Sequence, residues 1–370
     1  MADTVCRACH SRQGEIVLDL GYQPACDYFP ARDDPGPDPV YPLRMWLCSG
    51  CGLAQLMDDP TVPEEPRGAE PAALKEQAAD AVARVYAAGW LQPGARVAEY
   101  GSPHGGSWLP LLTDMGMSDV DGGRPADVVL DCFGMMHCRD QVAAIAERAA
   151  RVAPGGVLLL QFHSLATIVR SGQWNSLRHG HYAYYSTSAL ANLLALCGFT
   201  LCQAWQFDLY GGTVLVAATR QADLVRIPDE SVDRLIAGEE ELDLDDPERL
   251  GELQHAAVRR SRGVHGWLAA RQAAGSVTFG YGAASRAVSL LCRAGVDSSL
   301  LPCVVDASPT KQGRRMPGTD IPVVGPEALI TARPDAVLLF LPDLLAEVRR
   351  NIPEVEQAGG RWVDVETLSS

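Results

Sequence analysis

Two hydrophobic patterns alternate along this chain. Short apolar runs, such as residues 96–100, 126–130 and 336–340, are bounded by glycine, proline or charged residues and predict buried β-strands. Elsewhere apolar residues recur every three or four positions, as in residues 72–91, which predicts amphipathic helices. The alternation predicts an α/β fold class, with parallel sheets that bind ligands at the carboxyl ends of their strands.

The order of these elements divides the chain into four parts. We expect an N-terminal module at residues 1–65, a central Rossmann-like domain at 70–225, linking helices at 226–275 and a C-terminal Rossmann-like α/β domain at 276–370. The proline-rich, charged segment PTVPEEPRGAEP connects the first two parts.

The central domain is shorter than an ordinary cofactor-binding unit. Only about 14 residues separate Leu112 from Asp127, and we expect them to form a loop. A full unit has a second strand, a helix and a third strand here, with an acidic residue for a ribose roughly 20 residues after the glycines. Asp119 and Asp121 are the residues that would substitute for it. The sequence therefore predicts a truncated domain.

Composition limits the classes of partner. The chain has 370 residues, 47% of them hydrophobic, which is enough for two domains and a small module. Its net charge of −15 repels nucleic acids and acidic membranes. No apolar run approaches the roughly 20 residues of a membrane helix, and the first residues have no export pattern. We expect a cytoplasmic protein that acts on a small molecule.

Four cysteines in the N-terminal module predict a structural zinc site. Cys6 and Cys9 form one CxxC pair, and Cys48 and Cys51 form another after 38 intervening residues. Two such pairs place four thiolates around one tetrahedral ion and leave no open position for catalysis. A redox pair and a chance spacing are the alternatives. Cys26 does not match the spacing, and we expect it to be packed in the core.

A glycine turn follows the first strand of the central domain. Gly101 and Gly105 permit a tight turn whose backbone approaches a ligand at a helix N-terminus, and Glu99 lies at the end of the strand. Glycines are common in turns of α/β proteins, so the pattern alone is a weak signal. We expect Glu99, Gly101 and Gly105 to contact a cofactor.

The candidate catalytic groups lie in the stretch RHGHYAYYS, residues 178–186. Imidazole has a pKa near working pH, as a general base requires, so we predict that His181, with His179 and Arg178, carries the chemistry. His137 and His163 fall at the rim of the sheet, and we interpret them as structural.

The C-terminal domain repeats the pattern of strand, glycine turn and helix. Tyr281, Ala283, Lys311 and Arg314 lie in its turn and in a basic loop. They are expected either to hold a phosphate-bearing substrate or to belong to a packing scaffold.

Taken together, the motifs resemble the sugar C-methyltransferases of deoxysugar antibiotic pathways. The resemblance covers essentially the whole chain: the frame CxxC–LG-x-x-P–CxxCGLAQL, the E-x-G-S turn at 99–102, YGGT at 210–213, YGAAS, and VVDASPTKQGRRMPGTDIPV. It implies a zinc module, S-adenosylmethionine (SAM) in the central domain and a thymidine-diphosphate 4-keto sugar between the central and C-terminal domains. It also implies a histidine that removes the proton beside the ketone, after which the enolate carbon takes the methyl group.

The family motif Y-H-E-H-x-x-Y reads R-H-G-H-Y-A-Y here. His181 falls on the base and Tyr184 on the later tyrosine, which implies that Tyr184 binds substrate. Arg178 replaces the first tyrosine and Gly180 the glutamate. The asparagine-aspartate pair of the SAM turn is Pro103-His104, and PRGAEP has no counterpart of a second family tyrosine. Each lost charge-assisted hydrogen bond lowers SAM affinity by roughly 1.5–3 kcal/mol.

Three hypotheses follow. The first is a SAM-dependent C-methyltransferase acting on a nucleotide-linked keto sugar or a related natural-product intermediate, with His181 as the base. The second is a SAM-independent epimerase, isomerase or lyase in which Arg178 stabilises an enolate. The third is a non-catalytic partner protein that kept the fold.

Overall fold

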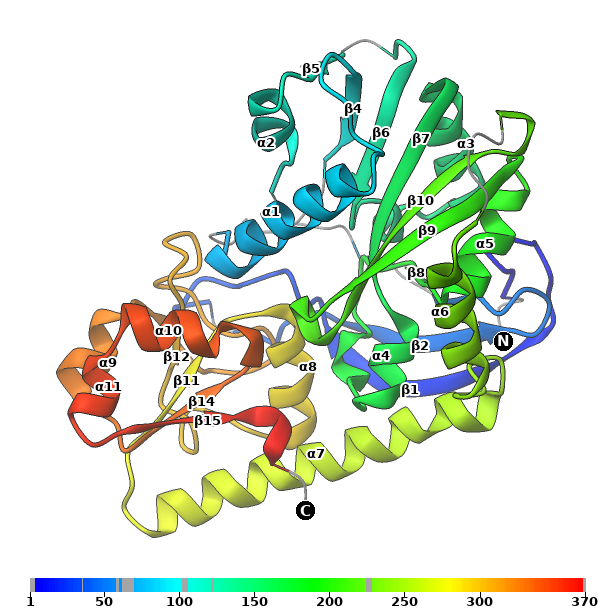
Figure 1. Ribbon diagram of the computed structural model, residues 1–370. Helices are drawn as coiled ribbons and strands as arrows, with labels where there is room; N and C mark the ends of the chain where they lie inside the picture. The colour runs from blue at the N-terminus through cyan, green and yellow to red at the C-terminus, as the bar shows by residue number, and fades with distance from the viewer. Residues whose placement is uncertain are drawn as a thin grey trace.

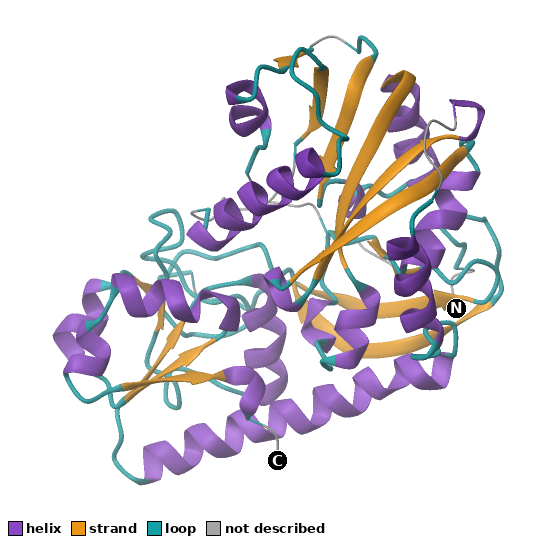
Figure 2. Cartoon of the chain, in the orientation of Figure 1, coloured by secondary structure: helices purple, strands orange, loops and turns teal. Residues whose placement is uncertain are grey.

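The computed structural model contains three sheets joined by helices, which Figure 1 shows by position and Figure 2 by type. It describes residues 4–34, 36–57, 60–61, 70–101, 106–120, 123–223 and 228–368. The predictions for Gly105, Asp121, Pro103-His104 and residues 66–69 of PRGAEP lie outside these ranges.

The N-terminal sheet is antiparallel and has the order β1-β2-β3-β8. Its strands are β1 (Gly14–Pro24), β2 (Val40–Cys48), β3 (Ala54–Leu56) and β8 (Ala183–Tyr184). Strand β1 contains a bulge, where its register with β2 shifts between Asp19 and Tyr22. Gly21 takes a φ of 71° there, which a residue without Cβ adopts without strain.

The central sheet is mixed and has the order β5-β4-β6-β7-β10-β9. Its strands are β4 (Arg96–Tyr100), β5 (Ser118–Asp119), β6 (Ala126–Cys132), β7 (Val152–His163), β9 (Phe199–Phe207) and β10 (Thr213–Arg220). Strands β5, β4, β6 and β7 are parallel to one another, whereas β10 runs antiparallel to both β7 and β9. The expectation of a parallel sheet therefore holds for one side of it.

Helices cover both faces of the central sheet. On one face α1 (Ala72–Ala87) and α2 (Leu109–Asp114) pack against alternate strand residues such as Leu159 and Leu215. On the other face α3 (Gln141–Arg151) and α5 (Thr187–Ala195) pack against the intervening ones. Because side chains alternate along a strand, each strand contributes to both layers of the core.

The shortened segment of the central domain contains one strand that the sequence did not predict. Ser118 and Asp119 form β5, which pairs in parallel with β4, so the expectation of a pure loop between Leu112 and Asp127 is wrong. Two residues are too few to give a hydrophobic pattern, which explains the miss. No helix or third strand occurs between β5 and β6 in the described residues there.

The C-terminal sheet is fully parallel, with the order β13-β12-β11-β14-β15. Its strands are β11 (Thr278–Tyr281), β12 (Val304–Val305), β13 (Val323–Val324), β14 (Ala336–Leu339) and β15 (Arg361–Asp364), and its helices are α8 (Ser285–Ala294), α9 (Glu327–Ala332), α10 (Leu345–Asn351) and α11 (Glu354–Gln357). Its first strand is central, so the strand order reverses between β11 and β14, where α/β proteins bind ligands.

One long helix runs beneath the molecule. After α6 (Glu230–Glu240), α7 (Pro247–Ala273) extends from the N-terminal sheet to the C-terminal domain (Figure 1). Its buried residues, among them Leu250, Leu253 and Ala257, recur every three or four positions and form one apolar stripe. This stripe joins a core shared by the N-terminal sheet, α4 (Leu165–Arg170) and α8.

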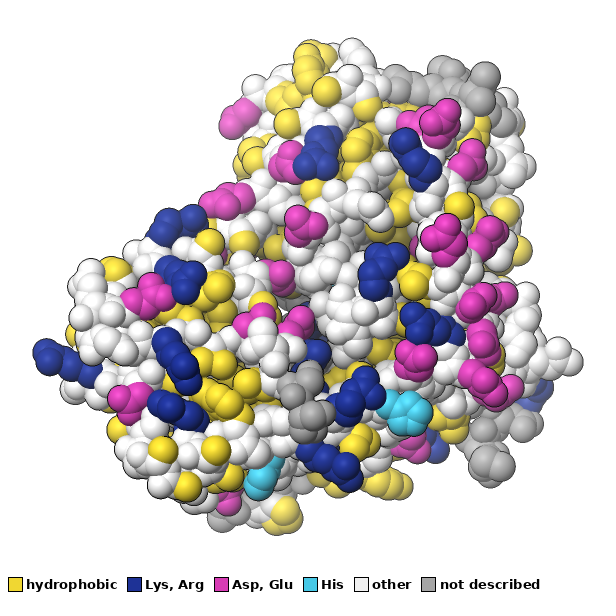
Figure 3. Space-filling model, turned by 60° about the horizontal axis from the view of Figure 1, so that its bottom comes forward, with side chains coloured by type: hydrophobic (Ala, Val, Ile, Leu, Met, Phe, Trp, Pro, Cys, Tyr) yellow, Lys and Arg dark blue, Asp and Glu magenta, His cyan; other side chains and the backbone are white. Residues whose placement is uncertain are grey.

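Acidic and basic side chains both spread over the face viewed from below (Figure 3). Within the described ranges, no helix is both long and apolar enough to cross a membrane.

Candidate functional site

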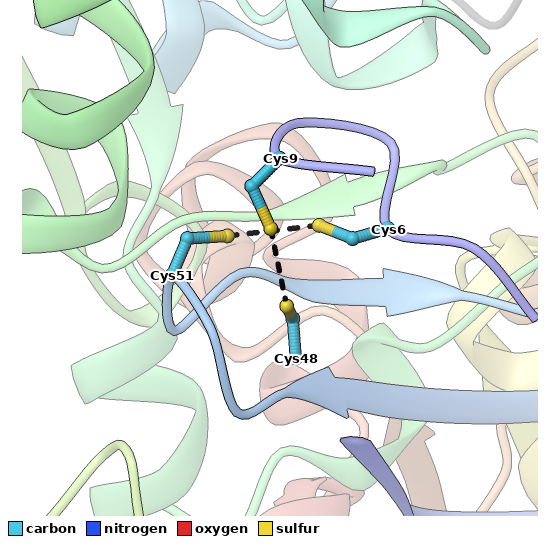
Figure 4. Close-up of side chains that lie close together, drawn as sticks. All are labelled: Cys6, Cys9, Cys48 and Cys51. Carbon is cyan, nitrogen blue, oxygen red and sulfur yellow. Dashed lines mark hydrogen bonds between the residues drawn. The ribbon is translucent and has the colours of Figure 1, made fainter. Parts of the chain in front are cut away.

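The four predicted cysteines converge at one point (Figure 4). All four Sγ atoms lie within 4.8 Å of one another, with Cys6 and Cys51 at 3.6 Å and Cys9 and Cys48 at 3.5 Å. Tetrahedral zinc with Zn–S bonds near 2.3 Å requires sulfur separations of about 3.8 Å, so the set fits this ion. The site is a zinc-binding one, and four protein ligands give the metal a structural role.

The zinc module also holds the predicted catalytic stretch. β8 pairs with β3, which begins three residues after Cys51, and the amide of Leu56 donates to the carbonyl of Tyr182 at 3.3 Å. Arg7, inside the first CxxC pair, lies 4.9 Å from the centroid of the Tyr182 ring and donates to the Leu56 carbonyl at 3.1 Å. Residues 182–184 are therefore tied to the zinc knuckles.

His181 lies in contact with a second histidine and an arginine. Its Nε2 accepts a hydrogen bond from Nε of Arg178 at 2.7 Å, and Nη2 of Arg178 contacts the same atom. The ring of His137 meets the ring of His181 edge-on, with centroids 4.4 Å apart. Burial, helped by the charge of Arg178, lowers the pKa of His137 to about 3, so its ring is neutral at physiological pH.

Arg178 connects the stretch to other parts of the chain. Its guanidinium contacts Oγ of Ser285, the first residue of α8, and lies 4.0 Å from the carboxylate of Asp27. The Arg178 side chain is only 10% exposed, which makes it a nearly buried cation at the junction of the three sheets.

The other predicted residues of the stretch bind the backbone around it. His179 places Nε2 at 3.2 Å from the carbonyl of Pro42 in β2. The hydroxyl of Tyr184 accepts from the amide of Arg178 at 3.1 Å and donates to the carbonyl of Ser176 at 3.2 Å. These bonds fix the loop that carries His181. The predicted catalytic role of His179 and the substrate-binding role of Tyr184 stay predictions.

The predicted cofactor residues lie at the carboxyl end of β4. Glu99 accepts from the amide of Trp108 at 2.6 Å and from the hydroxyl of Ser107, which ties it to the start of α2. Burial raises the pKa of Glu99, and the nearby charge of Asp119 adds to the effect. Among the described residues, no atom lies within 4 Å of the position that a Cβ on Gly101 would take. Two carboxylates, those of Glu99 and Asp119, thus lie at this edge together with Gly101.

The predicted substrate residues of the C-terminal domain lie at the carboxyl ends of β11 and β12. Tyr281 ends β11 and packs edge-on against Trp362, and burial together with Asp306 and Glu347 raises its pKa to about 12. Lys311 donates from Nζ to the carbonyl of Ala283 at 2.8 Å. Both residues therefore frame the glycine turn that precedes α8.

Two candidate functional residues, His137 and Arg286, were not predicted from the sequence. His137 was interpreted as structural, but it contacts His181. Arg286, which follows Ser285 in α8, reaches His163 of the central sheet with its guanidinium. The sequence signal that could have indicated His137 is its position after a buried strand. No sequence signal indicates Arg286, because its partner, His163, belongs to another domain.

Comparisons with known proteins agree with this architecture. A family model described as "C-methyltransferase C-terminal domain" matches residues 208–365, and one described as "Putative zinc binding domain" matches residues 6–65. The C-methyltransferase NovU of Streptomyces niveus is 24% identical over 404 residues, which cover 97% of this chain and 94% of NovU. The chain belongs to the zinc-containing C-methyltransferase family.

Solved structures of other methyltransferases resemble parts of this family member. The N-methyltransferase NodS of Bradyrhizobium japonicum, in complex with S-adenosylhomocysteine, is 13% identical with a TM-score of 0.31, covering 43% of this chain and 90% of NodS. The magnesium protoporphyrin IX methyltransferase ChlM of Synechocystis PCC 6803 is 14% identical with a TM-score of 0.30, covering 40% of this chain and 84% of ChlM. The family assignment rests on the family models and the full-length relative.

Proposed function

We propose that this protein transfers a methyl group from SAM to the carbon beside the carbonyl of a nucleotide-linked keto sugar. The observation that carries the proposal is the cluster of His181, His137 and Arg178, which lies where the central domain meets the α8 end of the C-terminal domain. The match to NovU, whose name states C-methylation, supports the reaction class.

The edge of the central sheet fits the methyl donor. Gly101 leaves room for a ligand beside the backbone, and each carboxylate of Glu99 and Asp119 has acceptor capacity for ribose hydroxyls. When bound, SAM supplies an electrophilic methyl group. The adjacent strand, β5, is only two residues long. Among the described residues of this edge, the side chains of Glu99 and Asp119 would therefore be the main polar contacts of SAM.

In this proposal, His181 accepts the substrate proton and Arg178 stabilises the negative charge of the enolate. Nε2 of His181 takes the proton from the substrate carbon, and the electron pair of the broken C–H bond moves to form the enolate. Arg178, which donates to Nε2 in this structure, turns to the enolate oxygen as the charge develops there. A single guanidinium thus keeps the base oriented before the reaction and stabilises the product of proton transfer.

The test uses thymidine-diphosphate 4-keto-6-deoxyglucose as the probe. With SAM present, we expect a product heavier by one methyl group in mass spectrometry, and deuterium exchange beside the ketone in D2O. H181A should lower both rates about 10²-fold or more, while H255A, at an exposed position of α7, should not change them. A wild-type protein with neither exchange nor methylation would contradict the proposal.

One observation favours a second function, proton transfer without methylation. No helix or further strand lies between β5 and β6 among the described residues, so the cofactor edge is reduced. Under this alternative the protein is an epimerase or isomerase. Calorimetric titration with SAM separates the two: no binding at millimolar SAM, together with deuterium exchange in its absence, favours the alternative.

A further inference from the structure

Asp27 is an acidic residue of the N-terminal module that lies beside the predicted catalytic stretch and has no part in the mechanism described above. It follows β1, and its carboxylate lies 4.0 Å from Nη1 of Arg178. The two side chains are 18% and 10% exposed. Residues 178–186 contain neither aspartate nor glutamate, so this carboxylate comes from a distant segment of the chain.

The guanidinium of Arg178 has contacts on two sides. Its Nε and Nη2 atoms face Nε2 of His181, with Nε at 2.7 Å. Its third nitrogen, Nη1, contacts Oγ of Ser285 and lies near Asp27. The side of the group that does not face the histidine therefore faces a hydroxyl and a carboxylate, and contacts on that side orient the other side toward His181.

A negative charge beside Arg178 has two physical effects. A nearly buried cation costs free energy unless an opposite charge compensates it, and Asp27 supplies such a charge. A guanidinium beside the proposed base also opposes the positive charge that the imidazole of His181 gains with a proton. A carboxylate on the far side of the guanidinium reduces this opposition. Asp27 can therefore influence the reaction without touching the substrate.

The residue before Asp27 packs against the predicted catalytic stretch as well. Cys26 is 4% exposed, and its Sγ lies 4.0 Å from the carbonyl of His179. The thiol belongs to the core that the N-terminal sheet shares with α7 and α8. This contact fixes the backbone on one side of Asp27.

The basic loop of the C-terminal domain fixes the backbone on the other side. Nη1 of Arg314 donates to the carbonyl of Phe29 at 2.7 Å, and Nζ of Lys311 lies 4.9 Å from the centroid of the Phe29 ring. The Phe29 side chain is buried. Two cations of the loop thus hold the chain two residues after Asp27, which places the carboxylate at the junction of the domains.

We propose that Asp27 is a positioning residue of the reaction, which acts through Arg178. Its carboxylate compensates the charge of the guanidinium and keeps Nε and Nη2 directed toward His181 until the enolate forms. The inference rests on the proposed function and deepens it, because it adds the residue that balances the charge of the site. No bond to Asp27 forms or breaks, and the substrate proton still goes to His181.

The first test measures deuterium exchange into thymidine-diphosphate 4-keto-6-deoxyglucose. D27N has the same shape without the charge, and its kcat should fall about tenfold while KM stays within about threefold of wild type. D27E keeps the charge and should retain kcat within about threefold. D33N, at an exposed position of the same connection between β1 and β2, is the matched control and should change neither constant.

A double-mutant cycle with R178M separates positioning from a merely structural role. If Asp27 acts through Arg178, adding D27N to R178M should lower the rate by less than about twofold. An equal, roughly tenfold loss in both backgrounds would overturn the inference. Circular dichroism and zinc content verify that each variant folds. D27S, which is smaller and also uncharged, replaces D27N in both tests if D27N does not fold.

A measurement without substrate follows the guanidinium itself. In protein labelled with 15N-arginine, the Nε–H signal of Arg178 is assigned by its absence in R178M. We expect this signal to shift in D27N and to stay in place in D33N, because only the first variant removes the carboxylate beside Nη1. A signal that D27N leaves unchanged would overturn the inference.

The two proposals fail differently. Wild-type protein that exchanges no deuterium overturns the proposed function and the role of Asp27 with it. Wild-type exchange together with a D27N rate within about twofold of wild type overturns the role of Asp27 alone.

Discussion

Arg178 is the residue in which this chain departs most clearly from the motif of its family. Where the resemblance implies a tyrosine, the structure has a nearly buried guanidinium bonded to His181 and to Ser285. A tyrosine hydroxyl is neutral, whereas arginine brings a fixed positive charge into the site where we propose that an enolate forms. The arginine therefore changes the charge of the site, whereas His181, the proposed base, is retained.

Replacing Arg178 by methionine tests this charge. We expect R178M to lower the rate of deuterium exchange about 10²-fold, because the developing oxyanion loses its cation. The pKa of His137 should rise in an NMR titration and stay below its usual value, because burial, the larger cause of its depression, remains. R178K keeps the charge without the planar fork and should recover part of the rate. Unchanged exchange in R178M would exclude Arg178 from the reaction.

Some residues of the site could be predicted from the sequence and others could not. The four zinc cysteines were found because ligand spacing within a CxxC pair is a local property. His181 was predicted from its motif, and its catalytic role stays a prediction. The contacts of His137 with His181 and of Arg286 with His163 were not, since each joins side chains from distant segments that only the folded chain brings together.

The same limit applies to strands. β4, β6 and β14 were predicted from apolar runs, but β8 has two residues, and its partner β3 lies more than a hundred positions earlier in the chain. Through β8, the predicted catalytic stretch forms the last strand of the zinc module's sheet, although the order of elements places it in the central domain. The four-part division stays a prediction, and this strand crosses one of its boundaries.

The pairing of β3 with β8 predicts that loss of zinc destabilises the predicted catalytic stretch. Removing the metal by chelation, or by C51S, should loosen β3. The amides of residues 182–184 should then exchange with deuterium about tenfold faster, which corresponds to a fall of about 1.4 kcal/mol in the free energy of local opening. Activity should fall in parallel. C197S, at a half-buried cysteine after α5, is the matched control. Unchanged exchange at 182–184 after zinc loss would show that β8 is held independently.

The N-terminal module is also joined to the C-terminal domain, through one ion pair. Asp38 accepts two hydrogen bonds of 2.6 Å from Arg315 and one of 2.6 Å from the amide of Gly318, and both charged side chains are at least nine-tenths buried. Burial alone would raise the pKa of Asp38, but these bonds outweigh it and lower the pKa. The N-terminal module is thus joined to the predicted catalytic stretch through β8 and to the C-terminal domain through Asp38.

Breaking this ion pair should destabilise the whole fold. D38N leaves Arg315 buried without its charge partner, and we expect a loss of about 3–5 kcal/mol in the free energy of unfolding, measured with urea. E356Q removes an exposed pair with Arg349 and should cost no more than about 1 kcal/mol. The pKa of Asp38 is lower in the folded protein than in the unfolded chain, where it is about 4. The Asp38 carboxylate therefore contributes its full share to the free energy of unfolding above about pH 4. This contribution is lost as the pH falls through the pKa of the folded protein. The gap between wild type and D38N should therefore narrow in acid; a gap that stays constant below pH 4 would mean that the Asp38 charge is not what stabilises the contact.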